Sequence, residues 1–405
     1  MPLLMLILDG MPDRPVAGKT PLSVAKKPNL DKIAEIGING IMDTISPGIR
    51  PGSDTSHLAL LGFDPYKFYM GRGPIEAAGV GIDLKPGDIA FRANFATVVG
   101  SGTVFDKVVV DRRAGRIEQT EDLVNALNEI DLPIDFEVAK ATGHRAVVVF
   151  RGNYSAELTE TDPKVVGEKV KKCKPLGDSA KEIAEIINEF TQKAHEVLEK
   201  HSLNLEREKK GLPKANAILL RGAGVMKEIP SFKDKYGLKL AVVSATALIK
   251  GVGRILGGDA FTPQGATGNK KTNLESKFSA SLDLLKKYDV VLLHIKAPDE
   301  LGHDRDFEGK VEFIEKLDPH LSRILELDFS KNCVIVTSDH STPVSVGEHT
   351  ADPVVVSVVH EGVRVDDVKR FTEFDAPKGG LCRIKGMDLL NIALDLLNLS
   401  KKFGA

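Results

Sequence analysis

Short runs of apolar residues recur along the chain and predict buried β-strands. Those that bear on the chemistry below are LLMLIL (3–8), LKLAVVSA (238–245), VVLLHI (290–295) and CVIVTS (333–338). Continuous apolar runs of this length are typical of parallel strands that are covered on both faces. Amphipathic helical patterns lie between and after them, at residues 28–38, 275–287, 308–326 and 386–397. This alternation of strand and helix predicts a doubly wound, mostly parallel α/β sheet.

The middle of the chain has a different pattern. Strand-like runs lie close together at residues 90–99, 103–111, 135–140 and 145–152. A long helical pattern follows at about 178–201, and this grouping predicts a separate α+β domain. Because 405 residues exceed what one hydrophobic core organises, we predict a discontinuous core domain, residues 1–72 and 238–405, with an inserted domain, residues 73–237.

Composition and charge exclude several classes of protein. Apolar residues make up 42% of the chain and charged residues 28%, as in ordinary globular proteins, and no apolar run approaches the ~20 residues of a membrane span. The N-terminal MPLLMLILDG lacks the basic region of a signal peptide, so it is interpreted as a first strand. A net charge of −2 gives no argument for nucleic acid or an anionic membrane as partner. The oligomeric state stays open.

The polar segment KHSLNLEREKKGLPKAN (200–216) is the strongest local exception to that charge balance. We interpret it as an exposed loop of the inserted domain, in preference to a basic patch for nucleic acid. Cys173, Cys333 and Cys382 are scattered without the spacing of a zinc site or a disulfide framework. Free thiols suit a reducing cytoplasm, which is the expected location.

Acidic residues follow directly after the predicted core strands. Asp9 lies in LILDG, Asp299 lies in HIKAPDELGHD, and Asp339 lies with His340 in IVTSDHS. Ligands of open α/β sheets gather at the carboxyl ends of the strands, so these side chains are expected at one edge. Singly, each Asp is more simply a turn or cap residue.

Imidazoles accompany these carboxylates. Asp299 and His303 are four residues apart, so one helical turn places both on the same side, and His349 follows in GEHTADP. A gathering of unpaired carboxylates at one edge would be repulsive, and divalent cations remove the conflict. Mixed oxygen and imidazole ligands suit Mn²⁺, Mg²⁺, Co²⁺ or Zn²⁺.

Ser53 in RPGSDTSHLALLG has two interpretations. Ser, Asp and Thr before an apolar helix are standard N-caps, so Ser53 or Asp54 could be only a cap of a helix beginning near Asp54. Alternatively, a hydroxyl between two cations loses its proton near neutral pH, and a helix start stabilises a phosphate on that oxygen. His57 in the same stretch has no assigned role beyond a place behind the site.

Five motifs together resemble one family. LILDG, PGSDTSHLALLGFDP, APDELGHD, TSDHSTP and GEHTADP are similar to the alkaline phosphatase superfamily, specifically its archaeal type of cofactor-independent phosphoglycerate mutase. The similarity runs from the first strand to the last helix and includes the inserted domain. It implies an alkaline-phosphatase-like core that interconverts 3-phosphoglycerate and 2-phosphoglycerate through a phosphoserine.

The resemblance also implies a ligand set for two ions, Mn²⁺ or Mg²⁺. One ion would be held by Asp9, Ser53, Asp339 and His340, and the other by Asp299, His303 and His349. Ser53 would be the phosphorylated nucleophile. A metal-dependent phosphomonoesterase, another phosphosugar mutase of the same superfamily and a non-catalytic metal-binding protein remain alternatives.

A mutase must also hold the dephosphorylated glycerate, which requires cationic side chains and a dry site. We expect a small phosphorylated substrate to be clamped by Arg221, Lys250, Arg112, Arg113, His144 and Arg145. Most of these lie in the inserted domain, which is therefore predicted to clamp substrate. The segment TETDPK has Lys164 where that family tends to have His, so its loop receives no role. GATGNKKTN (265–273) lacks the ending of a P-loop and is interpreted as an ordered turn.

Overall fold

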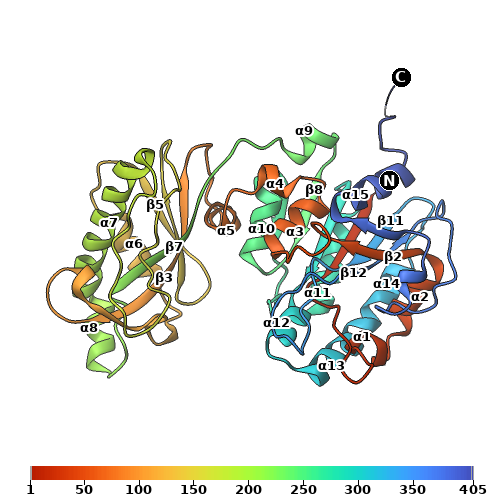
Figure 1. Cartoon of the computed structure of the whole chain (residues 1–405), viewed down its shortest axis with the longest axis horizontal. Coiled ribbons are helices and arrows are strands. Elements are labelled where there is room, and N and C mark those ends of the chain that lie inside the picture. Colours follow the sequence, from red (N-terminus) through yellow and green to blue (C-terminus); the bar gives the residue numbers. More distant parts are fainter. Residues whose placement is uncertain (1, 403, 405) are drawn as a thin grey trace. The chain divides into compact units, whose positions relative to one another are not determined.

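The computed structural model describes residues 2–402 and 404 and divides the chain into two compact units (Figure 1). The core unit runs up to Tyr69 and resumes at Ile229, and the inserted unit is Met70–Glu228. The sequence placed these boundaries at 72/73 and 237/238. The second boundary lies earlier in the structure than predicted, because the short helix Phe232–Tyr236 belongs to the core unit. Its residues Phe232 and Tyr236 pack against the ring of Phe63.

The core unit contains an eight-stranded sheet with helices on both sides (Figure 1). In spatial order its strands are β13 (Cys382–Lys385), β2 (Ile38–Asp43), β12 (Val354–Val359), β11 (Cys333–Thr337), β1 (Leu3–Leu8), β10 (Val290–Ile295), β8 (Leu240–Val243) and β9 (Asp259–Phe261). β11, β1, β10, β8 and β9 are mutually parallel, while β12 is antiparallel to both of its neighbours. The predicted mostly parallel α/β core is confirmed.

All six residues of β1 are buried, as the continuous apolar run predicted. The α-helices of the core unit are α1 (Pro21–Val24), α2 (Pro28–Ile36), α3 (Ser53–Leu60), α4 (Pro65–Phe68), α9 (Phe232–Tyr236), α10 (Ala247–Ile255), α11 (Leu274–Leu284), α12 (Ala297–His303), α13 (Phe307–Leu317), α14 (Ser322–Leu325) and α15 (Gly386–Leu396). On one face Leu4, Leu6 and Leu8 pack with Phe278 of α11 and Phe313 of α13. Burial on both faces is what requires β1 to be apolar throughout.

The inserted unit is an antiparallel sheet with its own core. Its strands are β3 (Ile89–Val99), β4 (Val108–Asp111), β5 (Phe136–Lys140), β6 (Arg145–Phe150) and β7 (Ala217–Val225). Its helices are α5 (Arg72–Val80), α6 (Glu121–Asn128), α7 (Lys181–Lys200) and α8 (Ser202–Lys209). The Phe150 ring makes edge-on contacts with Phe91 and Phe190, and Phe190 makes another with Phe136. The α+β character expected from the grouped strands is confirmed.

One local expectation differs from the structure. The segment 200–216 was expected to be a loop, but α8 occupies Ser202–Lys209 within it. Asn204, on an otherwise polar stretch, is fully buried and donates through Nδ2 to the carbonyl of Leu198 and that of Ala215. The buried amide of Asn204 therefore holds α8 in place, although the sequence of this helix carries no apolar stripe.

Among the described residues, no helix is long and apolar enough to cross a membrane.

The aromatic cluster around Phe150 supports a stability prediction. Phe150 is fully buried and is edge-on to Phe91 and Phe190. Phe150→Ala should lower the free energy of unfolding of the inserted unit by about 3–5 kcal/mol, because it leaves a cavity that neighbours cannot fill. Calorimetry of the whole chain measures this, with Val165→Ala, at a side chain 53% exposed, as the control. Equal effects of the two substitutions would contradict the packing described.

Candidate metal centre

Three buried carboxylates meet at the carboxyl ends of adjacent strands. Asp9 follows β1, Asp299 lies on α12 just after β10, and Asp339 follows β11. β1 lies between β10 and β11 and is parallel to both, so the three strand ends share one edge. The residues are 0%, 2% and 0% exposed. Pairing of these strands brings together charges from distant positions in the chain.

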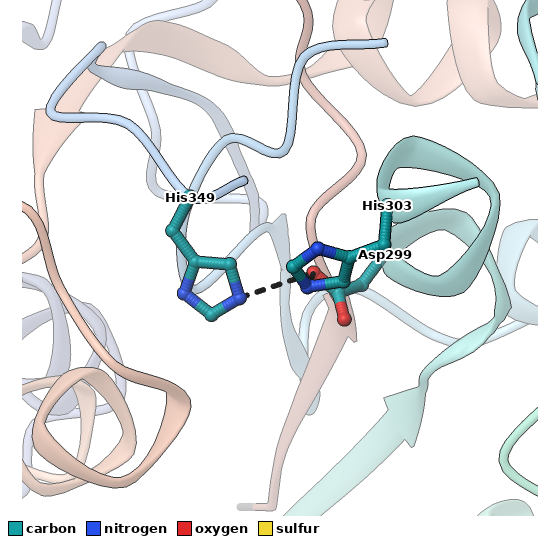
Figure 2. A group of neighbouring side chains, drawn as sticks. All are labelled: Asp299, His303 and His349. Carbon is teal, nitrogen blue, oxygen red and sulfur yellow. Dashed lines mark ion pairs between the residues drawn. The ribbon is translucent and has the colours of Figure 1, made fainter. Parts of the chain in front are cut away.

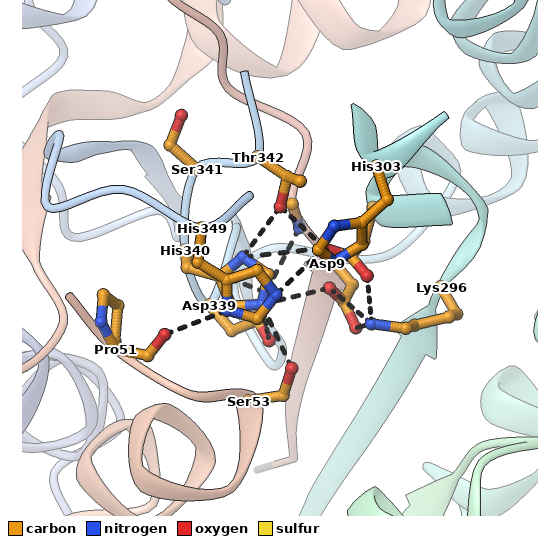
Figure 3. A network of polar contacts seen from close by, with 12 residues as sticks. Asp9, Pro51, Ser53, Lys296, His303, Asp339, His340, Ser341, Thr342 and His349 are labelled. Carbon is orange, nitrogen blue, oxygen red and sulfur yellow. Dashed lines mark hydrogen bonds and ion pairs between the residues drawn. The ribbon is translucent and has the colours of Figure 1, made fainter. Parts of the chain in front are cut away.

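The first group contains Asp9, Asp339 and His340, whose ligand atoms lie within 4.8 Å of one another. His340 Nε2 is 3.4 Å from Asp9 Oδ1 and 3.4 Å from Asp339 Oδ2. Burial lowers the pKa of His340 to about 3, so its imidazole is neutral near pH 7. Figure 3 shows these side chains converging with Ser53.

The second group contains Asp299, His303 and His349 (Figure 2). Both imidazoles place Nε2 against Asp299 Oδ1, at 3.4 Å for His303 and 3.3 Å for His349. Their Nδ1 atoms lie 2.9 Å from the Gly347 carbonyl and 3.0 Å from the Pro51 carbonyl. A carbonyl can only accept, so each Nδ1 donates and each Nε2 is directed toward the carboxylate, the arrangement typical of metal-ligating histidines.

Ser53 lies at the junction of the two groups. Its Oγ is 3.0 Å from His340 Nε2, and the His340 and His349 rings stack with centroids 3.5 Å apart. Thr342 Oγ1 donates to Asp299 Oδ1 at 2.6 Å and lies 3.1 Å from His340 Nδ1. His340 Nδ1 therefore donates to Thr342, which leaves Nε2 as an acceptor facing Ser53.

The helix-cap interpretation of Ser53 is wrong. α3 begins at Ser53 itself, one residue earlier than expected, and Gly52 is the N-cap. The Ser53 hydroxyl makes no capping hydrogen bond and turns to His340, while Thr55 Oγ1 bonds the Gly52 backbone. Ser53 is therefore the first residue of the helix, at the positive end of the helix dipole, and its hydroxyl points away from the helix backbone.

Lys296 was not anticipated from the sequence. Its Nζ is 3.1 Å from Asp9 Oδ2 and also donates to Asp299 Oδ2, so one ammonium touches a carboxylate of each group (Figure 3). Burial lowers the pKa of Lys296, but Asp9 and Asp299 outweigh it and raise that pKa above its ordinary value. For Asp299, burial acts to raise the pKa, but the contacts with His349 and Lys296 outweigh burial and hold that pKa well below its usual range.

The donor set fits divalent cations. Asp339 Oδ2 is buried and has no hydrogen-bond partner among the described residues. The Nε2 atoms of His303, His340 and His349 also face carboxylate oxygens, at 3.3–3.4 Å. Such atoms are costly to bury unless a cation satisfies them. Oxygen and neutral imidazole donors in this ratio suit Mn²⁺, Zn²⁺ or Co²⁺ and admit Mg²⁺.

His57 supports Ser53 from behind. It is fully buried, its Nδ1 is 2.7 Å from the Ser53 carbonyl, and the same atom is 3.7 Å from Asp339 Oδ2. Its Nδ1 donates to that carbonyl and fixes the first turn of α3 relative to the carboxylate. The sequence had left His57 without a role, and its position four residues after Ser53 was the available signal.

Five of the six cationic candidates lie in the inserted unit, and Asp162 organises two of them. Arg112 forms a two-pronged pair with the buried carboxylate of Asp162, at 3.1 Å and 2.5 Å. Arg221 Nε is 3.9 Å from the same carboxylate and its Nη2 is 3.4 Å from Asn94 Oδ1. Asp162 belongs to the TETDPK loop, so this loop orients Arg112, whereas its part in binding substrate stays a prediction.

Arg113, His144 and Arg145 lie in the same positive field as Arg221. Burial, together with the nearby charges of Arg145, Arg113 and Arg221, lowers the pKa of His144 to about 4. Such a cluster of cations around a neutral imidazole is suited to a multiply charged anion. The sixth candidate, Lys250, is on α10 of the core unit, where burial and Arg254 lower its pKa.

Comparison with known proteins gives one consistent result. A model of the metalloenzyme superfamily matches residues 1–396. The chain is 69% identical to 2,3-bisphosphoglycerate-independent phosphoglycerate mutase 1 of Archaeoglobus fulgidus over 100% of both chains, and 49% identical to the enzyme of that name from Methanopyrus kandleri over 100% and 98%. A solved structure titled cofactor-independent phosphoglycerate mutase, from Thermoplasma acidophilum, matches with a TM-score of 0.75 and 35% identity over 98% and 99% of the chains.

Gly10 generates a prediction about how tightly the site is built. It has φ +64°, and a Cβ there would lie 2.5 Å from Thr342 Oγ1 and 2.7 Å from the Asp299 Cβ. Gly10→Ala should cost about 1–3 kcal/mol beyond backbone strain, because it pushes Asp299 and Thr342 out of place, and should weaken Mn²⁺ binding.

Gly18→Ala is the matched control, since Gly18 also has positive φ (+77°) but has nothing within 4 Å of an added Cβ. Thermal unfolding and Mn²⁺ titration compare the two variants. If both lose the same stability and bind Mn²⁺ alike, the close approach of Gly10 to Asp299 has no bearing on the site.

Proposed function

Because this chain belongs to the 2,3-bisphosphoglycerate-independent phosphoglycerate mutases of the metalloenzyme superfamily, we propose that a phosphoserine at Ser53 carries the phosphoryl group. The chain is an isomerase that interconverts 3-phosphoglycerate and 2-phosphoglycerate in glycolysis. The observation that supports the nucleophile assignment is the direction of the Ser53 hydroxyl, which turns away from its own helix toward His340 and the carboxylates.

We assign one divalent ion to Asp9, Ser53, Asp339 and His340 and a second to Asp299, His303 and His349. Bound there, the ions lower the pKa of an oxygen ligand and neutralise charge on the phosphate. Mn²⁺ is the preferred candidate for both groups because each mixes carboxylate and imidazole donors, and Mg²⁺ is the alternative.

The residues of the chain account for the remaining requirements of phosphoryl transfer. Ser53 Oγ attacks the substrate phosphorus and the bond from phosphorus to the glycerate oxygen breaks. The other glycerate hydroxyl then attacks the phosphoserine, which restores Ser53. The positive end of the α3 dipole and the Lys296 ammonium would stabilise the negative charge that develops on the phosphate oxygens.

The glycerate must stay bound between the two transfers, since release would leave a phosphoserine for water to hydrolyse. We assign that task to Lys250 of the core unit and to the cations Arg112, Arg113, His144, Arg145 and Arg221 of the inserted unit. The bidentate pair with Asp162 holds the Arg112 guanidinium in one orientation. A preset guanidinium loses less freedom when it takes a carboxylate or phosphate.

Ser53→Ala should lower turnover of 3-phosphoglycerate by at least about 10⁴-fold, as loss of a nucleophile does in other enzymes. Stability should change little, since the Ser53 hydroxyl caps no helix. Formation of 2-phosphoglycerate and of free phosphate are both measured. Ser56→Ala is the control, because Ser56 is a fully buried serine of the same helix whose hydroxyl lies against Thr44.

Two results would contradict the proposal in different ways. Retained activity in Ser53→Ala would remove Ser53 as nucleophile. Release of mainly free phosphate by the unaltered chain would instead indicate a phosphomonoesterase on the same core.

Removal of metal gives a further prediction. Prolonged EDTA treatment should lower turnover by about 100-fold or more, the scale of losing one charge-stabilising group, and addition of Mn²⁺ should restore it. The bound metal is counted by elemental analysis before and after treatment. Full activity at a metal content near zero would overturn the two-ion assignment.

A further inference from the structure

A buried chain of hydrogen bonds begins at Asp9. Asp9 Oδ2 is 2.7 Å from His294 Nε2, and His294 Nδ1 is 3.1 Å from Ser244 Oγ. All three residues are 0% exposed. His294 is on β10 and Ser244 follows β8, so the chain crosses the neighbouring strands of the parallel sheet.

The chain of hydrogen bonds continues to the start of α10. Ser244 Oγ accepts the backbone N–H of Thr246 at 3.1 Å and lies 3.0 Å from Thr246 Oγ1. Thr246 is the N-cap residue of α10, the helix that carries Lys250. The hydrogen bonds therefore join a carboxylate of the metal centre to the helix that presents a candidate substrate cation.

Donor and acceptor roles along this chain follow from its two ends. The Asp9 carboxylate has no hydrogen to give, so His294 Nε2 must donate to it. With hydrogen on Nε2, the neutral ring can only accept at Nδ1, so Ser244 Oγ donates to it. Ser244 Oγ then accepts the Thr246 N–H and the Thr246 hydroxyl hydrogen. The Ser244 hydroxyl thus favours the ring tautomer that carries hydrogen on Nε2.

Further contacts hold the His294 ring and backbone. Lys277 Nζ, fully buried, donates to the His294 carbonyl at 3.1 Å and to the Thr267 carbonyl at 3.4 Å. The His294 ring is edge-on to His57 with centroids 5.4 Å apart, and His57 holds the Ser53 carbonyl. His294 is therefore placed against both the carboxylate and the nucleophile's helix.

We propose that His294 is a positioning residue for the ion at the Asp9 group, and that Ser244 acts through it by fixing the donating tautomer. With Oδ2 engaged by His294, Asp9 turns Oδ1 toward His340. The Asp299 group has its own supports, the carbonyls of Gly347 and Pro51. Loss of the Ser244 hydroxyl should therefore weaken binding of the ion at the Asp9 group and leave binding at the Asp299 group unchanged. The inference rests on the proposed two-ion site.

Calorimetric titration of the EDTA-treated full-length protein with Mn²⁺ alone tests the effect on binding. Ser244→Ala should raise the dissociation constant of one ion by about 10-fold or more, within the range seen when a partner behind a metal ligand is lost, and leave the other nearly unchanged. Turnover should fall at limiting Mn²⁺ and recover at high Mn²⁺. Ser281→Ala is the control, because Ser281 is fully buried but donates only to a carbonyl of its own helix.

His294 itself provides a graded pair of variants. His294→Gln retains an N–H donor at about the reach of Nε2, while His294→Leu retains the bulk without a donor. We expect Gln to bind Mn²⁺ more tightly than Leu at the affected site. This comparison decides the matter if Ser244→Ala does not fold.

A spectroscopic measurement separates tautomer control from packing. Nitrogen-15 NMR of histidine-labelled protein should show His294, assigned by the signal lost in His294→Gln, with hydrogen on Nε2 alone, and Ser244→Ala should introduce the Nδ1 form. Unchanged tautomer and unchanged binding of both ions in Ser244→Ala would overturn the inference while leaving the two-ion site intact. If the unaltered protein bound fewer than two Mn²⁺, the proposed function and this inference would both fall.

Discussion

The burial of three carboxylates at neighbouring strand ends is the constraint on which the rest of the core unit depends. Asp9, Asp299 and Asp339 are almost inaccessible and come from strands that pair side by side. Like charges held so close repel one another unless cations compensate them. The ammonium of Lys296 supplies one positive charge between Asp9 and Asp299. Asp339 Oδ2 has no hydrogen-bond partner among the described residues, so its negative charge is not compensated by a side chain of the protein. Divalent ions complete the balance, and Ser53 lies where they would meet.

The fold keeps this crowded edge rigid by buried polar braces around it. Lys310 Nζ, fully buried, donates to Asp13 Oδ2 at 2.9 Å and to the Thr342 carbonyl at 3.0 Å, which joins the loops after β1 and β11. Gly10 allows those loops to approach α12 at a distance no side chain would permit. Positions of ligand atoms matter to within fractions of an ångström for phosphoryl transfer, so such braces serve the chemistry as well as stability.

How much the sequence predicts depends on whether a signal is local. The apolar runs located β1, β8, β10 and β11 and therefore the edge where Asp9, Asp299 and Asp339 gather, because strand burial and strand-end position are readable from neighbours in the chain. Lys296, His294 and Asp162 were missed, since their importance lies in partners that only the folded sheet brings close. The start of α3 was misplaced by one residue because Gly52, with no side chain to recognise, supplies the cap.

The most direct test of the account is an anomalous-scattering map from crystals of the protein grown with Mn²⁺. We expect two manganese peaks, one bounded by Asp9, Asp339 and His340 and one bounded by Asp299, His303 and His349, with Ser53 Oγ adjacent to the first. A single peak, or two peaks away from these side chains, would contradict the claim that the buried carboxylates form a two-ion site for phosphoryl transfer.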